Sequence, residues 1–269
     1  MGATETAGRQ ARRVANSRTF DRLARLGLVC RGVLYLLIGL LALRISFGSG
    51  SEEADESGAI ATLAGTPFGS VTLWLMLVGF AALAVWQLME AAVGSGDTGA
   101  RAEAAARTAF YGVLVAILAN LLLAGDGPES SDQHAKDLTA KALGFPAGQL
   151  LVTAAGLGLL SLGLYWLYQC LTRRFREDLH TGRMSPRTRS VVTALGVVGY
   201  ATRGVIAGLA AVFLVRAAIE YEPDRARGLD ATLRSFADTA AGPWLLTVIA
   251  LGLLLFAAYC MAEARWRRV

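Results

Sequence analysis

Charged residues are scarce in this sequence. Only 17% of its 269 residues are Asp, Glu, Lys or Arg, whereas a soluble chain usually carries about 25%. The charges are also unevenly spread. Several runs of about twenty apolar residues contain almost none, and a helix of that length crosses the ~30 Å hydrocarbon core of a membrane. The lack of charge therefore argues against a soluble protein and predicts an all-α integral membrane protein.

Residues that commonly catalyse reactions or bind metals are also rare. The sequence has three cysteines and two histidines, and it lacks the H-E-x-x-H motif, closely spaced metal ligands and the G-x-x-x-x-G-K-[ST] phosphate loop. No Asp or Glu falls near the middle of a predicted span, where a proton relay or an ion-coupled pump needs one. The acidic run at residues 52–56 is interpreted as a hydrated loop, with divalent-cation binding as the weaker alternative. We therefore expect no catalytic residue, no metal, no cofactor and no enzymatic activity.

Six apolar runs are predicted to span the membrane. They cover residues 26–47, 70–93, 107–124, 147–170, 191–218 and 243–263. Lysine and arginine are concentrated before the first run and after the second, fourth and sixth runs, whereas the other connections are mainly acidic. Under the positive-inside rule, both termini are cytoplasmic. This asymmetry also explains the net charge of +5, which therefore indicates anionic lipid headgroups, and not nucleic acid, as partners of the cytoplasmic arginines.

The spans form three similar pairs, so the chain is predicted to contain one two-helix unit three times. The segments are a basic cytoplasmic N-terminal part (1–25), repeat 1 (26–93), repeat 2 (107–170), a basic cytoplasmic loop (171–190), repeat 3 (191–263) and a basic cytoplasmic tail (264–269). Because each repeat crosses twice and returns to the same side, the copies are parallel. The simplest arrangement is a six-helix bundle with pseudo-threefold symmetry about an axis near the membrane normal.

Glycines recur at matching places in the repeats, and we predict that they let helices approach closely. The set comprises Gly32, Gly112 and Gly204 in the first helices, Gly79, Gly158 and Gly252 in the second helices, and Gly208 in a Gly204-x-x-x-Gly208 motif.

Polar residues recur near the predicted cytoplasmic ends of the spans. The first helices carry Arg31, Tyr111 and Arg203, and the ends of the second helices carry Glu90, Gln169 and Glu263. Because the middle repeat loses charge at both positions, we predict that the two positions meet. The predicted contacts are Arg31–Glu90 and Arg203–Glu263, within a repeat or between neighbours, and they form a structural clasp. Independent snorkelling to the interface and a transport or substrate site are the alternatives.

Four features carry a resemblance to a known family. They are the Arg31-Gly32 step that opens a helix, the acidic loop after the first span, the Pro67-Phe68-Gly69 turn and the aromatic-x-x-x-Glu end of the second helix. With these features the chain resembles the bacterial membrane family catalogued as domain of unknown function 1206, over about residues 20–268. The resemblance implies three two-helix repeats and a bacterial inner membrane, and it implies no activity. The middle copy departs from the pattern at Tyr111 and Gln169.

Taken together, the sequence predicts a non-enzymatic inner-membrane protein that interacts with lipids or partner proteins. The alternative is a small channel or passive transporter with a pathway along the pseudo-threefold axis. Apolar side chains filling this axis would favour the first function, and a continuous cavity lined by polar side chains would favour the second.

Overall fold

The computed structural model describes residues 18–48, 53–93, 98–124, 130–237 and 242–267. Helices make up 88% of the described residues, which contain no strand, and this confirms the all-helical prediction. Residues 1–17 of the predicted basic N-terminal segment lie outside the described residues, as do residues 268–269 of the predicted tail.

Six helices are long and apolar enough to cross a membrane, as predicted. They are α2 (Arg18–Ser46), α4 (Gly69–Val93), α5 (Thr98–Ala119), α7 (Gly148–Thr172), α8 (Pro186–Glu220) and α10 (Gly242–Trp266). Helix α5 continues into one π-helical stretch, η1 (Asn120–Ala124).

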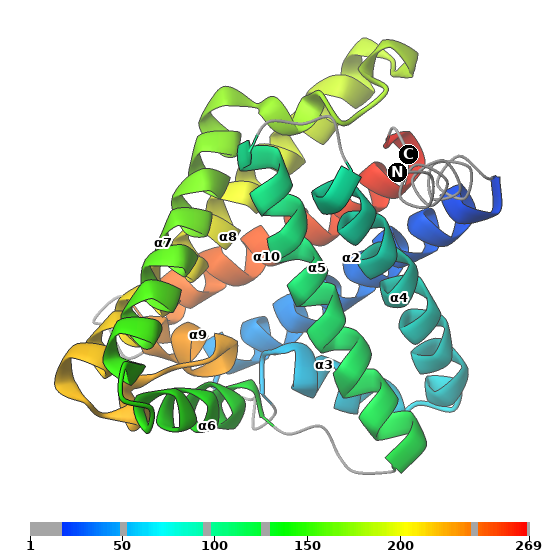
Figure 1. Ribbon diagram of the computed structural model, residues 1–269. Coiled ribbons are helices and arrows are strands. Elements are labelled where there is room, and N and C mark those ends of the chain that lie inside the picture. Colours follow the sequence, from blue (N-terminus) through cyan, green and yellow to red (C-terminus); the bar gives the residue numbers. More distant parts are fainter. Residues whose placement is uncertain (1–17, 49–52, 94–97, 125–129, 238–241, 268–269) are drawn as a thin grey trace, which may run out of the picture.

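A short helix lies between the two long helices of each repeat. These short helices are α3 (Glu56–Ala64), α6 (Ser131–Leu143) and α9 (Leu229–Ala237), and a 3-10 turn, η4 (Pro223–Arg225), precedes α9. Figure 1 shows α3, α6 and α9 together at one end of the bundle, which we call the short-helix end. Each repeat therefore has the order long, short, long.

Hydrogen bonds from side chains to the backbone hold the short helices in place. The Asp55 carboxylate caps α3 by accepting from the Gly58 amide at 2.7 Å, as expected of an N-cap residue. The Asp230 carboxylate accepts from the Ala54 amide at 2.8 Å and so links α9 to the start of α3. The Asp132 carboxylate likewise accepts from the amide of Ala231 at 3.0 Å and links α6 to α9.

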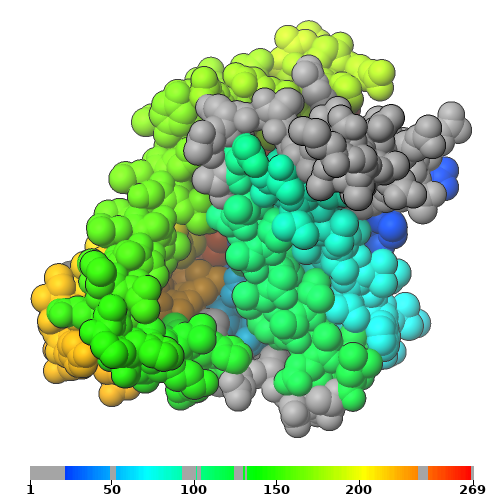
Figure 2. Space-filling model, viewed as in Figure 1, coloured from blue at the N-terminus to red at the C-terminus, as the bar shows by residue number. Residues whose placement is uncertain are grey.

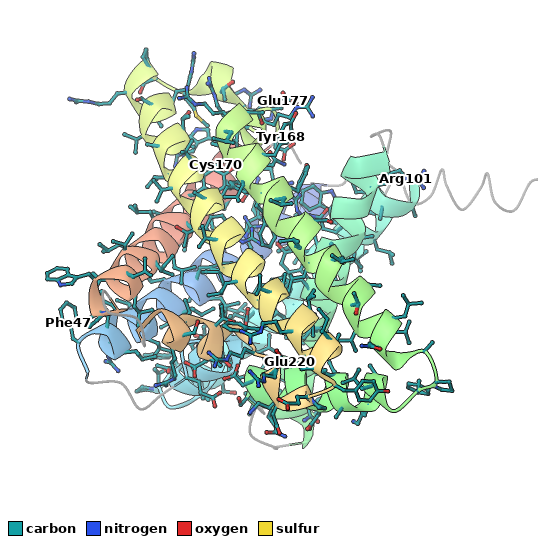
Figure 3. The ribbon with its side chains drawn as sticks, turned by 90° about the vertical axis from the view of Figure 1, so that its left-hand side faces the viewer. Phe47, Arg101, Tyr168, Cys170, Glu177 and Glu220 are labelled. Atoms are coloured by element: carbon teal, nitrogen blue, oxygen red, sulfur yellow. The ribbon has the colours of Figure 1, made fainter. Side chains whose placement is uncertain are left out.

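The opposite end of the bundle holds the start of α2, the end of α10 and the connection from α7 to α8. The Arg25 guanidinium donates to the carbonyl oxygen of Ala264 at 3.1 Å, which fixes the first long helix against the last. The connection contains two 3-10 turns, η2 (Arg174–Arg176) and η3 (Thr181–Arg183). In Figure 3, Cys170 and Glu177 lie at this end and Glu220 lies toward the short-helix end.

The long helices pack in a cyclic order. The second long helix of each repeat packs along the first long helix of the next, so that α4 packs on α5, α7 on α8, and α10 back on α2. We call each of these three contacts a seam. Within a repeat, α2 also packs on α4 and α8 on α10, but the described residues of α5 and α7 make little contact. The middle repeat is therefore open between its two long helices.

Aromatic side chains fill much of the core beside α8 and α10. Phe175, Tyr200, Phe256 and Tyr259 are buried and pack against one another, with ring centroids 5.3 to 5.9 Å apart. Phe175 belongs to the connection between α7 and α8, so this connection is packed into the core. Such burial of large rings is a major source of packing energy.

The structure gives four of the predicted glycines a packing role. A methyl group added at Gly32 would meet the Met261 side chain, at Gly79 the backbone of Gly27, at Gly204 the backbone of Gly163, and at Gly252 the Thr202 side chain.

The three other predicted glycines differ from this pattern. A methyl group at Gly112, Gly158 or Gly208 would meet no neighbouring atom within 4 Å. Gly79 and Gly252 contact the first long helix of their own repeat. Gly158 is their equivalent in the middle repeat, and it lacks this contact because α7 is separated from α5. Gly112 is equivalent to Gly32 and Gly204, which contact the helix across a seam, but a methyl group there would meet no atom of α4 at its own seam.

Exchange of repeat-equivalent glycines for alanine tests this difference. Gly252→Ala pushes a methyl group into the stiff Thr202 side chain, and we expect it to lower the free energy of unfolding by about 1–3 kcal/mol. Gly158→Ala meets open space and should raise it by roughly 0.5–1 kcal/mol, because alanine favours a helix over glycine. Unfolding in detergent micelles measures both, and an equal loss of stability in the two variants would contradict the packing described.

Candidate functional site

A buried polar cluster surrounds Arg31 on α2. Its guanidinium donates to the Tyr111 hydroxyl of α5 at 3.0 Å and to the Cys260 sulfur of α10 at 3.3 Å, and it forms an ion pair with Glu263 of α10. Glu263 forms a second ion pair with Arg267, just beyond the end of α10. Arg31 is 6% exposed and Glu263 is 1% exposed. Buried charges are tolerated when paired and hydrogen-bonded in this way.

The pairing in this cluster differs from the predicted pairing. Arg31 meets Glu263, from the third repeat, and within the described residues no ion pair joins it to Glu90, which is exposed. The ion pairs that Glu263 makes in the described part of the chain are with Arg31 and Arg267, and not with Arg203. The reason is the cyclic packing, since the neighbour of α2 at its seam is α10, and α10 turns Glu263 toward Arg31.

Arg203 on α8 lies among aromatic rings, and it forms no ion pair with a carboxylate of the described residues. Its guanidinium carbon is 3.8 Å from the centre of the Trp166 ring, 4.8 Å from that of Phe256 and 5.6 Å from that of Tyr35. Such contacts stabilise a cation through the ring quadrupole. In the part of the chain that the structure describes, Arg203 has no hydrogen bond and no ion pair.

Gln169 stands in the middle repeat where Glu263 stands in the third. It is buried, and its amide nitrogen donates to the Tyr165 hydroxyl of the preceding turn at 2.8 Å. Its amide oxygen is buried without a hydrogen-bond partner. Among the three seams, therefore, the one between α10 and α2 carries an ion pair at these positions. The seam between α7 and α8 has Gln169 and Arg203, and the seam between α4 and α5 has Glu90 and Tyr111.

A cavity of about 260 Å³ opens between α5 and α7. Figure 2 shows the hollow on the side of the bundle, between the green surface of α7 and the blue-green surface of α5. Its apolar wall includes Phe110 and Leu162, and its charged lining residues are Arg31, Glu56, Arg107 and Arg203. The cavity lies where the middle repeat is open, and it combines a mainly apolar surface with an excess of arginine.

Glu56, at the start of α3, is the acidic residue among those that line the cavity. The pKa of its carboxyl is raised from 4.5 to about 7, mainly because the group is buried. A backbone hydrogen bond and the Arg203 charge reduce this shift, and the charge of Asp55 adds to it. The carboxyl is therefore partly protonated near neutral pH. Among the described residues, no group of three His, Cys, Asp or Glu side chains is arranged to hold a metal ion.

Several residues of the site were not predicted from the sequence. Trp166, Arg107, Glu56 and Arg267 line the cavity or join the buried cluster. The repeat pattern does indicate Trp166, because it precedes Gln169 by three residues just as Cys260 precedes Glu263. In the structure, Trp166 contacts Arg203, and Cys260 contacts Arg31. The other residues have no such counterpart in the sequence pattern.

Comparison with known proteins gives matches over most of the chain. The profile of the family described as Domain of Unknown Function (DUF1206) matches three times, at residues 26–94, 102–173 and 198–267. An uncharacterized protein, YxxB, of Bacillus subtilis (strain 168) is 26% identical over 252 residues, which cover 92% of this chain and 91% of that protein. No solved structure matches.

Removal of the Glu263 carboxylate tests the buried cluster. Glu263→Ala leaves the buried Arg31 charge without its counter-ion, and we expect a loss of about 3–5 kcal/mol in the free energy of unfolding. Glu90→Ala, the same change at the equivalent exposed position of the first repeat, should alter it by no more than roughly 0.5 kcal/mol. Unfolding of both variants in detergent micelles provides the comparison. Equal effects would show that Glu263 does not hold the helices together.

The raised pKa of Glu56 predicts a pH dependence of stability. Between pH 4.5 and about 7, the folded protein holds a proton that the unfolded chain has lost, so stability falls as the pH rises through this window. Glu56→Gln cannot ionise, and its melting temperature should therefore exceed that of the wild type at about pH 8 but not at about pH 4. Glu90→Gln is the matched control. Parallel curves of melting temperature against pH for wild type and Glu56→Gln would refute the shift.

Proposed function

The chain belongs to the family described as Domain of Unknown Function (DUF1206), and we propose that it is a multi-pass membrane protein that binds a lipid and catalyses no reaction. The lipid occupies the cavity between α5 and α7. The observation that carries this proposal is the position of the cavity, which opens sideways between two helices that are apolar enough to lie in a bilayer.

The proposed placement in the membrane follows the distribution of charge. Acidic residues gather at the short-helix end, among them Asp55, Asp132 and Asp230. The opposite end carries the basic connection between α7 and α8, with residues 173–189. By the positive-inside rule, the basic end faces the cytoplasm of a bacterial inner membrane and the short-helix end faces outward. Both termini are then cytoplasmic, and the basic connection is available to anionic headgroups or a partner protein.

The cyclic order of the seams supports pseudo-threefold symmetry. In such an arrangement, α2, α5 and α8 are equivalent, and so are α4, α7 and α10. The three seams repeat one contact around the axis. The missing contact between α5 and α7 breaks the symmetry at one place. An acyl chain in the cavity restores apolar contact there.

Lipid binding fits the cavity better than the conduction of ions or water does. The aromatic core between α8 and α10 is closely packed, and the ion pair of Arg31 and Glu263 is almost completely buried. A hydrated pathway needs a continuous polar lining, and apolar side chains such as Phe110, Leu162 and Leu253 interrupt the polar residues that line the cavity. The cavity wall is instead mainly apolar and its mouth faces sideways, which favours entry from the bilayer.

A bulky side chain in the cavity tests lipid binding. Leu162→Trp places an indole among the lining residues of α7, so less lipid should remain bound after purification in a mild detergent. Leu164→Trp makes the same change two residues away, at a position that is 57% exposed, and should retain lipid as the wild type does. Native mass spectrometry measures the bound fraction. Equal retention by the two variants and the wild type would exclude the cavity as the binding site.

A further inference from the structure

We propose that Arg203 binds the anionic headgroup of the lipid in this cavity, an inference that rests on the proposed lipid-binding function. Lipid binding as such needs only the apolar wall and the lateral opening. The further step is the chemical class of the ligand, a membrane lipid with a negatively charged headgroup, and the residue that selects it.

The repeat itself supplies an internal comparison for Arg203. Arg31 occupies the equivalent position in the first repeat, where Glu263 neutralises it across the seam between α10 and α2. Across the seam between α7 and α8, the equivalent of Glu263 is Gln169, which is uncharged and bonds to Tyr165. The seam of Arg203 thus has no carboxylate at this position. An arginine facing a cavity between apolar helices is costly unless something balances its charge.

The aromatic surroundings hold Arg203 without using its hydrogen-bond donors. Trp166 contacts the guanidinium at 3.8 Å from ring centre to carbon, and Phe256 lies at 4.8 Å. The N–H groups of arginine lie in the plane of the guanidinium, so contact with a ring face leaves them able to form a two-bond contact with a phosphate or carboxylate. Arg203 is therefore oriented and still has donors for a ligand.

The other charged groups around the cavity favour an anion. Arg203 contributes a positive charge without an ion pair to a described carboxylate, whereas the charge of Arg31 is balanced by Glu263. The opposing group is Glu56, and burial keeps it partly protonated near neutral pH by raising its pKa to about 7. A lipid whose headgroup is negative and whose chain contacts Phe110 and Leu162 matches both parts of this lining.

Two lipids that differ only in the headgroup test the proposal. Delipidated protein in detergent micelles is titrated with phosphatidylglycerol, with diacylglycerol of the same acyl chains, and with inorganic phosphate, and binding is followed by native mass spectrometry. We expect the wild type to bind phosphatidylglycerol about tenfold more tightly than diacylglycerol, the scale of a charge-assisted contact. Inorganic phosphate should bind far more weakly, because it lacks the apolar chain.

Variants of Arg203 then assign the preference. Arg203→Gln should bind both lipids with the affinity that the wild type has for diacylglycerol, and Arg203→Lys should keep part of the preference. The control is Arg174→Gln, because Arg174 also lies over an aromatic ring, Tyr168 at 5.7 Å, but is not part of the cavity lining. It should behave as the wild type does.

The outcomes separate this inference from the proposed function. Failure of both lipids to bind the wild type would remove the lipid-binding function and this inference with it. Equal binding of the two lipids, or an unchanged preference in Arg203→Gln, would leave lipid binding intact and overturn the role of Arg203. Tight binding of inorganic phosphate alone would overturn the assignment to a lipid.

Discussion

The ion pair between Arg31 and Glu263 is the interaction on which the arrangement of the long helices depends. It joins residues 232 positions apart and fixes α2 against α10. The Tyr111 hydroxyl adds α5 to the same contact. Because both charges are buried, a shift of either helix would leave an unpaired charge in an apolar environment. The pair therefore fixes α10 as the neighbour of α2 and sets the register of these two helices, beyond any stability that it contributes.

The middle repeat departs from the other two in charge and in packing. Tyr111 replaces an arginine and Gln169 replaces a glutamate, while Gly112 and Gly158 meet no neighbour within reach of an added methyl group. These departures coincide with the separation of α5 from α7 and with the cavity between them. In the proposed symmetry, one interface of the bundle is missing, and the proposed lipid site is the cavity that lies there.

The sequence was sufficient for the six long helices and the three repeats, because each leaves a local or periodic signal. It did not predict the short helices α3, α6 and α9, which lie in segments interpreted as loops. Nor was it sufficient for the pairing of the polar positions. The positions of Arg31 and Glu90 both lose their charge in the middle repeat, which suggests that these two residues meet. Arg31 instead meets Glu263, because the order of the helices around the bundle is a tertiary property. The cavity was not predictable for a similar reason. Gly158 and Gly252 occupy the same position in their repeats, and only the three-dimensional structure shows that Gly252 is packed against a neighbouring helix whereas Gly158 is not.

The cavity and Arg203 each carry a free-energy cost, and one ligand can remove both. An opening between apolar helices forfeits packing contacts, and an arginine without an ion-pair partner beside a mainly apolar cavity carries a desolvation cost. An uncharged acyl chain would fill the space but leave the charge of Arg203 unbalanced. A free anion would balance that charge but leave the surfaces of Phe110 and Leu162 without contacts. An anionic lipid meets both requirements at once, so the loss of charge at Gln169 and the loss of packing at Gly158 have a common explanation.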